Sequence, residues 1–288
     1  MVKTYSSTSG DRVRLQEWSP GTWEPHFYFQ GKQLFYNRIP FNNRAERAIE
    51  IPIALEFLQR QSGSLLEVGN VLQYYETGTL PPRRIVDKFE QGDGIDNCDI
   101  MDMQPAEERF QSIISISTVE HVGQGSDPTG GFGETSVRSD LEAPLKAIVR
   151  LYELLEMGGK ALITVPFGKL LDGGWYIQFS SEYLERLFLR YGMPREAVTV
   201  GYMKWVAREK KWRNPRQCWV EATAEEMKEV RYDHLFSGAR GIAVLELTKI
   251  VETCAVMEHE ALDPLVYERM LPFHRVLAPL GRLKKLLS

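Results

Sequence analysis

Short apolar runs that end in turn residues alternate with segments of helical spacing between residues 64 and 250. The expected strands are 64–68, 84–86, 98–101, 112–117, 161–165, 197–206 and 241–250, and the expected helices between them are 141–156 and 181–191. Alternation of this kind predicts a parallel sheet covered by helices on both faces. A polar, tryptophan-bearing stretch separates the last two strands, so we expect an antiparallel edge there. The pattern therefore predicts an α/β fold.

The first 43 residues are irregular and rich in aromatic side chains. We interpret residues 1–43 as an aromatic N-terminal cap segment that contains a short hairpin over 26–36. The following stretch, 44–60, carries apolar residues at helical spacing and predicts an amphipathic helix despite Pro52. The main domain is then expected to span 44–252.

The last segment, 253–288, is interpreted as a helical appendage because prolines divide it into short pieces. Its end is basic and amphipathic, which would permit weak contact with an anionic membrane surface. Packing against its own domain or a partner chain is the favoured alternative, because one short tail with three cations is a weak anchor.

Composition narrows the class of protein. The chain has 288 residues, is 43% hydrophobic and carries a formal net charge of −4. This mild acidity argues against a nucleic-acid partner. No apolar run is long enough to span a bilayer, the N-terminus lacks an apolar signal core, and the three cysteines are isolated. We therefore expect a cytoplasmic protein without an integral membrane segment or a metal site.

Polar residues follow the ends of the predicted strands. The run Leu65–Asn70 delivers Glu67 and then Gly69, and Asp87 follows the second strand eighteen residues after Gly69. Asp99-Ile100 comes next, and the fourth strand opens into Ser117-Thr118 and Glu120-His121-Val122. In an open parallel sheet, ligands bind beyond the carboxyl ends of the strands. The sequence thus predicts a ligand site that includes a small backbone turn and the carboxylates of Glu67 and Asp87.

This set of motifs resembles the class I S-adenosylmethionine-dependent methyltransferases, over about residues 45–250. The matching stretches are Leu65–Asn70, Val86-Asp87, Asp99-Ile100, Ile113–Val122 and Gly158–Pro166. The resemblance implies a Rossmann-like, seven-stranded, mostly parallel sheet between helices with an antiparallel edge strand. It also implies S-adenosyl-L-methionine as cofactor and a small-molecule acceptor.

The resemblance further implies a role for each matching residue. The turn Glu67–Gly69 would lie under the methionine part of the cofactor, and Asp87 would hold the ribose. Asp99 and Ile100 would contact the adenine, although Asp93, Asp96 and Asp102 compete for that role. Ser117 and Thr118 would line the floor near the sulfonium. Asn70 stands where the family usually repeats a glycine, and we interpret it as a residue that keeps the turn by tolerating left-handed geometry.

Charge gives an independent reason to favour a cationic cofactor. Pyrophosphate sites favour several glycines at a helix N-terminus, whereas here Glu67 occupies the turn and Asn70-Val71-Leu72 replace the later glycines. This argues against a nicotinamide oxidoreductase. A non-catalytic binding module that keeps the fold stays open as the main alternative to an enzyme.

The chemistry is expected to be O-methylation of a small molecule. His121 is the candidate general base, with a packing role as its alternative, and Asp127 is a second acid–base candidate. The glycine-rich loop 123–140 is long enough for a lid over the acceptor, or else is a surface insertion. Trp175 and Tyr176 follow the fifth strand and are candidates for the wall of the acceptor site, although both could be plain core residues.

Overall fold

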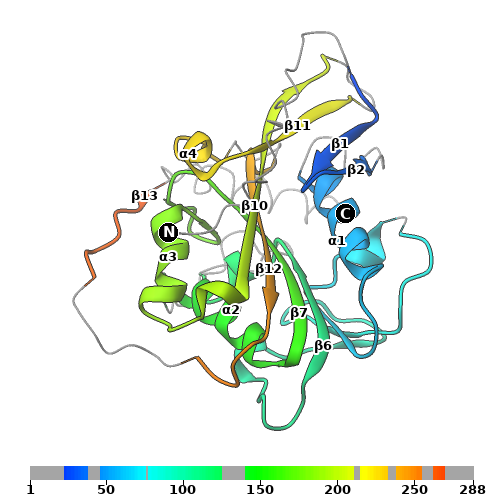
Figure 1. The fold of residues 1–288 in the computed structure, drawn as a ribbon, viewed down its shortest axis with the longest axis vertical. Coiled ribbons are helices and arrows are strands. Elements are labelled where there is room, and N and C mark those ends of the chain that lie inside the picture. The colour runs from blue at the N-terminus through cyan, green and yellow to red at the C-terminus, as the bar shows by residue number, and fades with distance from the viewer. Residues whose placement is uncertain are drawn as a thin grey trace, which may run out of the picture.

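The computed structural model describes residues 23–37, 46–75, 77–124, 140–210, 215–232, 238–254 and 262–269 (Figure 1). Its strands are β1 His26–Phe29, β2 Lys32–Phe35, β3 Leu65–Val68, β4 Arg84–Val86, β5 Ile95–Asp96, β6 Phe110–Ile116, β7 Leu155–Pro166, β8 Leu171–Asp172, β9 Ile177–Gln178, β10 Val198–Arg208, β11 Gln217–Ala222, β12 Gly241–Thr248 and β13 Glu268–Arg269. Its α-helices are α1 Arg47–Leu58, α2 Ala143–Glu153, α3 Ser181–Leu189 and α4 Ala224–Met227, and its 3-10 turns are η1 Leu72–Tyr74, η2 Ile100–Asp102, η3 Val119–His121 and η4 Arg195–Ala197.

The main sheet has eight strands in the order β11-β10-β12-β7-β6-β3-β4-β5. Strands β3 to β7 pair in parallel, which confirms the predicted α/β fold. The antiparallel strand β12 lies inside the sheet, between β7 and β10, and pairs antiparallel with both. The excursion before β12 supplies an additional strand, β11, which forms the edge and runs antiparallel to β10.

One predicted strand is wrong. Residues 98–101 were expected to be extended, but the third strand of the parallel part lies earlier, at Ile95–Asp96, and η2 follows it. The reason is local: the side chain of Asp99 accepts a hydrogen bond from the N–H of Met101 and so begins a turn.

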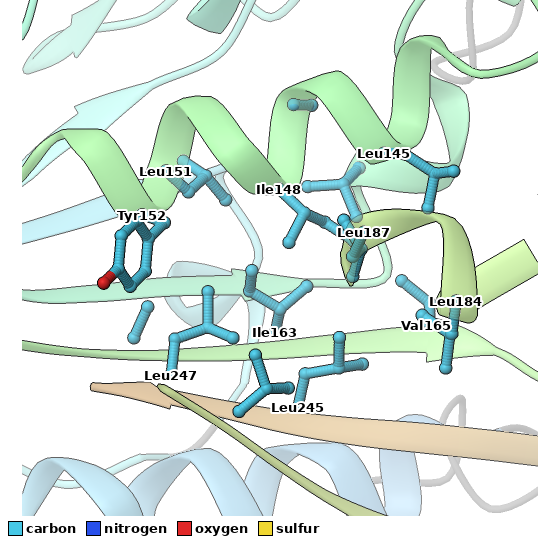
Figure 2. Close-up of a cluster of buried hydrophobic side chains, with 14 of the residues drawn as sticks. Leu145, Ile148, Leu151, Tyr152, Ile163, Val165, Leu184, Leu187, Leu245 and Leu247 are labelled. Atoms are coloured by element: carbon cyan, nitrogen blue, oxygen red, sulfur yellow. The ribbon is translucent and has the colours of Figure 1, made fainter. Parts of the chain in front are cut away.

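Helices cover both faces of the sheet, α1 on one face and α2 and α3 on the other (Figure 1). Figure 2 shows the core beneath α2 and α3, with the labelled side chains Leu145, Ile148, Leu151, Tyr152, Ile163, Val165, Leu184, Leu187, Leu245 and Leu247. The helical members recur every three or four residues and the strand members every second residue, as the two periodicities require. Burying each such side chain contributes about 1.5–3 kcal/mol.

The opposite face uses the alternate positions of the same strands. Ile114, Leu162 and Val244 pack with apolar residues of α1, including Ile53 and Phe57. The strands are therefore apolar on both sides, which is why they appear in the sequence as continuous apolar runs.

Pro52 lies inside α1 without ending it. A proline has no N–H, so the carbonyl of residue i−4 loses its helical partner. Here that carbonyl, of Ala48, accepts a hydrogen bond of 2.9 Å from the N–H of Asn37 instead. The proline thus frees an acceptor that fixes the end of the β1–β2 hairpin to the helix.

The strand order reverses at β3. The chain passes from β3 outward to β4 and β5, while β6 and β7 lie on the other side of β3. The carboxyl ends of β3 and β6 therefore meet at a topological switch point, where open α/β sheets bind their ligands.

None of the helices within the described ranges has both the length and the apolar character of a membrane span. Of the C-terminal segment, the structure describes 253–254 and 262–269, and the second stretch includes β13, which pairs in parallel with β8.

Candidate functional site

A cavity of about 580 Å³ opens at the switch point, within the usual range for small-molecule sites. It is lined by Glu46, Arg47, Val68, Gly69, Asn70, Val71, Val86, Asp87, Lys88, Phe89, Glu90, Cys98, Asp99, Ile100, Ser117, Thr118, Glu120, His121, Val122, Gly123, Gln124, Trp175 and Tyr232. The structure thus brings together Gly69, Asn70, Asp87, Asp99, Ile100, Ser117, Thr118, His121 and Trp175 from the residues that the sequence singled out.

The turn after β3 is shaped by Gly69. Its φ of +81° lies in the left-handed region, and its N–H donates to the carbonyl of Val86 at 2.8 Å. A Cβ at this position would lie 2.2 Å from Oγ1 of Thr118. Glycine is therefore required both by the backbone conformation and by the close approach of the β6 end.

Glu67 does not line the cavity, contrary to the expectation that it would lie against the cofactor. Its side chain is 1% exposed, and Oε1 accepts hydrogen bonds from the N–H groups of Val71 and Leu72. Oε2 pairs with Arg83. Both carboxylate oxygens of Glu67 are therefore bound within the protein, one by backbone N–H groups after β3 and the other by Arg83. Glu67 stabilises the turn from the side away from the cavity.

Asn70 has a different role from the one its type suggested. Its backbone is not left-handed; Gly69 provides that conformation. The Asn70 side chain instead donates to Oε1 of Glu90 at 2.6 Å, and Tyr74 and Gln73 donate to the same oxygen. Asn70 thus helps to fix a second carboxylate, Glu90, beside the cavity.

Asp87 and Asp99 both line the cavity. Asp87 directly follows β4, and Asp99 lies between the neighbouring strand β5 and η2. Oδ1 of Asp87 accepts from the N–H groups of Phe89 and Glu90, which orients the carboxylate. Asp99 accepts from Met101 N–H and pairs with Lys88 at 2.7 Å. A carboxylate offers about four lone-pair sites, so each can still accept bonds from a ligand.

Ser117 and Thr118 form the floor at the end of β6. Ser117 has a φ of +40°, an unusual conformation for a residue with a side chain and one that costs on the order of 1–2 kcal/mol. Its N–H donates to the carbonyl of Thr164, and its hydroxyl donates to Oε1 of Glu50 at 2.6 Å. The strained residue is therefore held from β7 and from α1 at once.

His121 stacks on Trp175, with ring centroids 4.7 Å apart and an angle of 8° between the planes. Nδ1 lies 2.8 Å from the carbonyl oxygen of Trp175, which can only accept, so Nδ1 carries the proton and Nε2 is unprotonated. Burial lowers the pKa of His121 to about 4, opposed by the hydrogen bond to Trp175. The imidazole is therefore neutral at pH 7.

One further predicted residue, Tyr176, is not among the described residues that line the cavity. Tyr176 is 2% exposed and packs against Tyr232, with ring centroids 4.5 Å apart. Tyr176 therefore supports the wall that Trp175 and Tyr232 form. Asp127 and most of the expected lid loop, 125–139, lie outside the described residues.

Sequence reasoning missed Glu46, Arg47, Glu90 and Tyr232, which also line the cavity. Glu46 and Arg47 look like ordinary first-turn residues of an amphipathic helix, and no local signal shows that this helix begins at the cavity.

The charge of the cavity is mostly negative. Among the described lining residues, five are carboxylates and only Arg47 and Lys88 are cationic. The cavity thus favours positive charge and disfavours pyrophosphate. No group of side chains within the described ranges could hold a metal ion.

No family model and no curated protein sequence matches the chain. Among solved structures, N-methyltransferase NodS from Bradyrhizobium japonicum WM9, in complex with S-adenosyl-L-homocysteine, is 12% identical with a TM-score of 0.35, over 68% of this chain and 84% of that one. A possible histamine N-methyltransferase from Thermotoga maritima is 14% identical with a TM-score of 0.37, over 74% and 91%. The 1,6-didemethyltoxoflavin-N1-methyltransferase of Burkholderia thailandensis is 14% identical with a TM-score of 0.35, over 70% and 78%.

These similarities are low, and the class of protein is defined by its own strand order and cavity. The chain is a doubly wound α/β protein of the Rossmann-like kind, with a cavity rich in carboxylates at its topological switch point.

Proposed function

We propose that the protein is a class I S-adenosylmethionine-dependent methyltransferase acting on a small molecule. The observation that carries this proposal is the cavity at the β3/β6 switch point, which joins a glycine turn, two sheet-tip carboxylates and an excess of acidic groups. A sulfonium cofactor needs this combination: close backbone approach, hydroxyl-binding carboxylates and a negative environment.

The lining residues fit the parts of this cofactor. Asp87 would accept hydrogen bonds from the ribose hydroxyls, with Glu90 beside it. Asp99 and the buried side chain of Ile100 would hold the adenine. The turn at Gly69-Asn70 would lie against the methionine part, and Ser117 and Thr118 would lie nearest the sulfonium. When bound, the cofactor supplies an electrophilic methyl group; the chain aligns the acceptor with it and excludes water.

The sequence favoured a hydroxyl as the methyl acceptor, with His121 as its base. The imidazole is neutral and its Nε2 is unprotonated at pH 7, but a pKa of about 4 makes it a weak base, which counts against this role. His121 therefore gives little support to O-methylation.

Calorimetric titration tests the cofactor proposal. We expect the protein to bind S-adenosylmethionine and S-adenosylhomocysteine, and not NADH. Asp87→Ala should weaken binding by roughly 1–3 kcal/mol, about 5- to 150-fold. Asp96→Ala is the matched control, because Asp96 lies on the adjacent strand, is outside the cavity and pairs with Arg84.

A folded protein that binds neither adenosyl compound would overturn the proposal and favour the non-catalytic binding module. Binding without methyl transfer to any acceptor would support the cofactor site but contradict the proposed enzymatic activity. Equal weakening by Asp87→Ala and Asp96→Ala would show that the ribose position is wrong.

A further inference from the structure

Three glutamates and one arginine meet at one end of the cavity. Glu46 and Arg47 come from the start of α1, Glu50 from its first turn, and Glu120 from η3 after β6; we call Glu46, Glu50 and Glu120 the acid group. Glu50 is fully buried and Glu120 is 2% exposed. Three carboxylates in so small a buried space are unfavourable unless positive charge or protons compensate them.

Arg47 pairs directly with only one of them. Its guanidinium pairs with Glu50, whose Oε1 also accepts the hydroxyl hydrogen of Ser117. Glu46 accepts a hydrogen bond from the N–H of Ala239 through Oε2. The cavity-lining members Glu46 and Glu120 therefore share the charge of Arg47 with Glu50, and the direct ion pair of that arginine within the acid group is with Glu50.

Glu120 also has an unused acceptor. Its Oε2 is buried and has no hydrogen-bond partner within the part of the chain that the structure describes. Its Oε1 lies 3.7 Å from Nε2 of His121, and that nitrogen carries no proton because Nδ1 does. When Glu120 is ionised, its Oε1 and Nε2 of His121 are thus two acceptor atoms side by side in the cavity wall without a donor between them. A buried acceptor left unpaired is costly, and a ligand that brings N–H donors would recover this cost.

The remaining wall of this end is aromatic. Trp175 and Tyr232 both line the cavity, and Tyr232 packs on Tyr176 behind it. Aromatic faces beside carboxylates are a favourable environment for an ammonium group, through cation–π attraction as well as charge. A hydroxyl would bring one donor and no charge, and would leave most of this environment unsatisfied.

We propose that the acceptor is a small basic amine, bound as its ammonium ion between Glu120, Glu46 and the rings of Trp175 and Tyr232. This inference rests on the proposed methyltransferase function and names its substrate class, and it replaces the hydroxyl acceptor that the sequence favoured. Arg47 at the start of α1 and Tyr75 at the end of η1 face the same acids, and the ammonium ion is the missing cation of the group.

The acid group also contains an acceptor for the ammonium proton that must leave before methyl transfer. An ammonium has no lone pair, so it first passes one N–H proton to the carboxylate of Glu120. Burial raises the pKa of Glu120 well above its usual range, which makes its carboxylate a strong proton acceptor, and the charge of the bound ammonium ion favours the ionised form that this transfer needs. The freed lone pair then forms the N–C bond to the methyl carbon while the C–S bond breaks and sulfur keeps its electron pair. The product is the protonated N-methylated amine, and Glu120 returns its proton to water after the product leaves.

The test compares amines with alcohols of the same skeleton, such as cyclohexylmethylamine with cyclohexylmethanol and phenethylamine with phenethyl alcohol. Binding is measured by calorimetry to the wild-type protein saturated with S-adenosylhomocysteine. We expect every amine that binds to do so at least tenfold more tightly than its alcohol. Glu120→Gln should remove this preference and change the affinity for S-adenosylhomocysteine less than twofold. Glu209→Gln, a buried glutamate paired with Arg216 outside the cavity, is the matched control and should behave like the wild type.

The wild-type comparison decides the proposal even if Glu120→Gln fails to fold. Alcohols that bind as tightly as the amines, or a panel in which no amine binds the loaded protein, would overturn it. Failure to bind S-adenosylhomocysteine in the first step would instead count against the methyltransferase function, so the two failures are distinguishable.

Discussion

Gly69 and Thr118 come from different strands, and the end of β6 packs so closely on the turn after β3 that a Cβ at residue 69 would lie 2.2 Å from Thr118 Oγ1. The two segments that line this part of the cavity are thus fitted to each other without a side chain between them. Any substituent at residue 69 must displace the floor of the cavity.

Gly69→Ala should therefore lower the free energy of unfolding more than an equivalent change elsewhere. The backbone strain at a positive φ costs about 1–2 kcal/mol, and the clash adds a further ~1–3 kcal/mol. Gly94→Ala is the matched control, because Gly94 also has a positive φ but no atom lies within 4 Å of the place that a Cβ would take. Urea unfolding of both variants and of Gly69→Ala/Thr118→Ala measures the difference. Equal losses in the two single variants, or no recovery in the double variant, would contradict the packing argument.

Glu67→Gln should lower the free energy of unfolding of the ligand-free protein, because Glu67 stabilises the turn after β3 and does not line the cavity. Removing one partner of a buried ion pair costs about 3–5 kcal/mol, whereas replacing both is often nearly neutral. We therefore expect Glu67→Gln alone to be less stable than the double variant Glu67→Gln/Arg83→Met in urea unfolding. A Glu67→Gln protein of wild-type stability that binds S-adenosylhomocysteine poorly would instead return Glu67 to the cofactor.

His121 should make stability depend on pH in a known direction. Burial lowers its pKa to about 4 in the folded state, against an ordinary value of 6.5. Between these values the unfolded chain binds a proton that the folded chain does not, so stability is lost as the pH falls from 6.5 towards 4. From pH 7 to pH 5 this amounts to about 2 kcal/mol. His121→Asn keeps a donor for the Trp175 carbonyl and should show a pH dependence smaller by that amount in urea unfolding; an unchanged dependence would refute the assignment.

Glu46 should act in the opposite direction. Burial and the charge of Glu50 raise its pKa to about 7 from 4.5, while Arg47 opposes the shift. The folded protein therefore holds a proton that the unfolded chain has lost, and stability falls as the pH rises from 4.5 through 7. Glu46→Gln should be more stable than the wild type at pH 8 by roughly 1–3 kcal/mol and within about 1 kcal/mol of it at pH 5. Urea unfolding at both pH values checks this, and a variant that is less stable at pH 8 would show that the carboxylate charge is needed there.

Much of the fold can be predicted because its signals are local. The apolar runs at β3, β4, β6, β7, β10 and β12 alternate with turn residues and helical spacing, and the hairpin and α1 follow from the same kind of pattern. The strand at Ile95–Asp96 was missed because two residues carry almost no pattern. The added strand β11 was missed because its excursion is polar and its pairing with β10 is a long-range contact.

The candidate site divides in the same way. Asp87 and Ser117 are found at strand ends, and strand ends of a parallel sheet share one edge, so periodicity alone places them together. Asp99 also reaches the cavity, although it follows β5 and does not belong to the strand predicted over 98–101. Glu67 has the same sequence signal, yet the structure turns its carboxylate towards Arg83 and the following backbone. The sequence therefore places Glu67 near the end of β3, but it does not show which neighbouring groups its carboxylate binds.

The order of residues alone specifies the parallel sheet, its polar tips and a turn that suits a cation better than a pyrophosphate, because these depend on periodicity, turn chemistry and local charge. It takes the folded chain to show that Glu46, Glu120 and Tyr232 meet at one end of the cavity, since they lie on segments far apart in the sequence. Long-range packing also buries Glu50 and Glu120, and burial makes carboxylates unfavourable unless a proton or a positive charge compensates them.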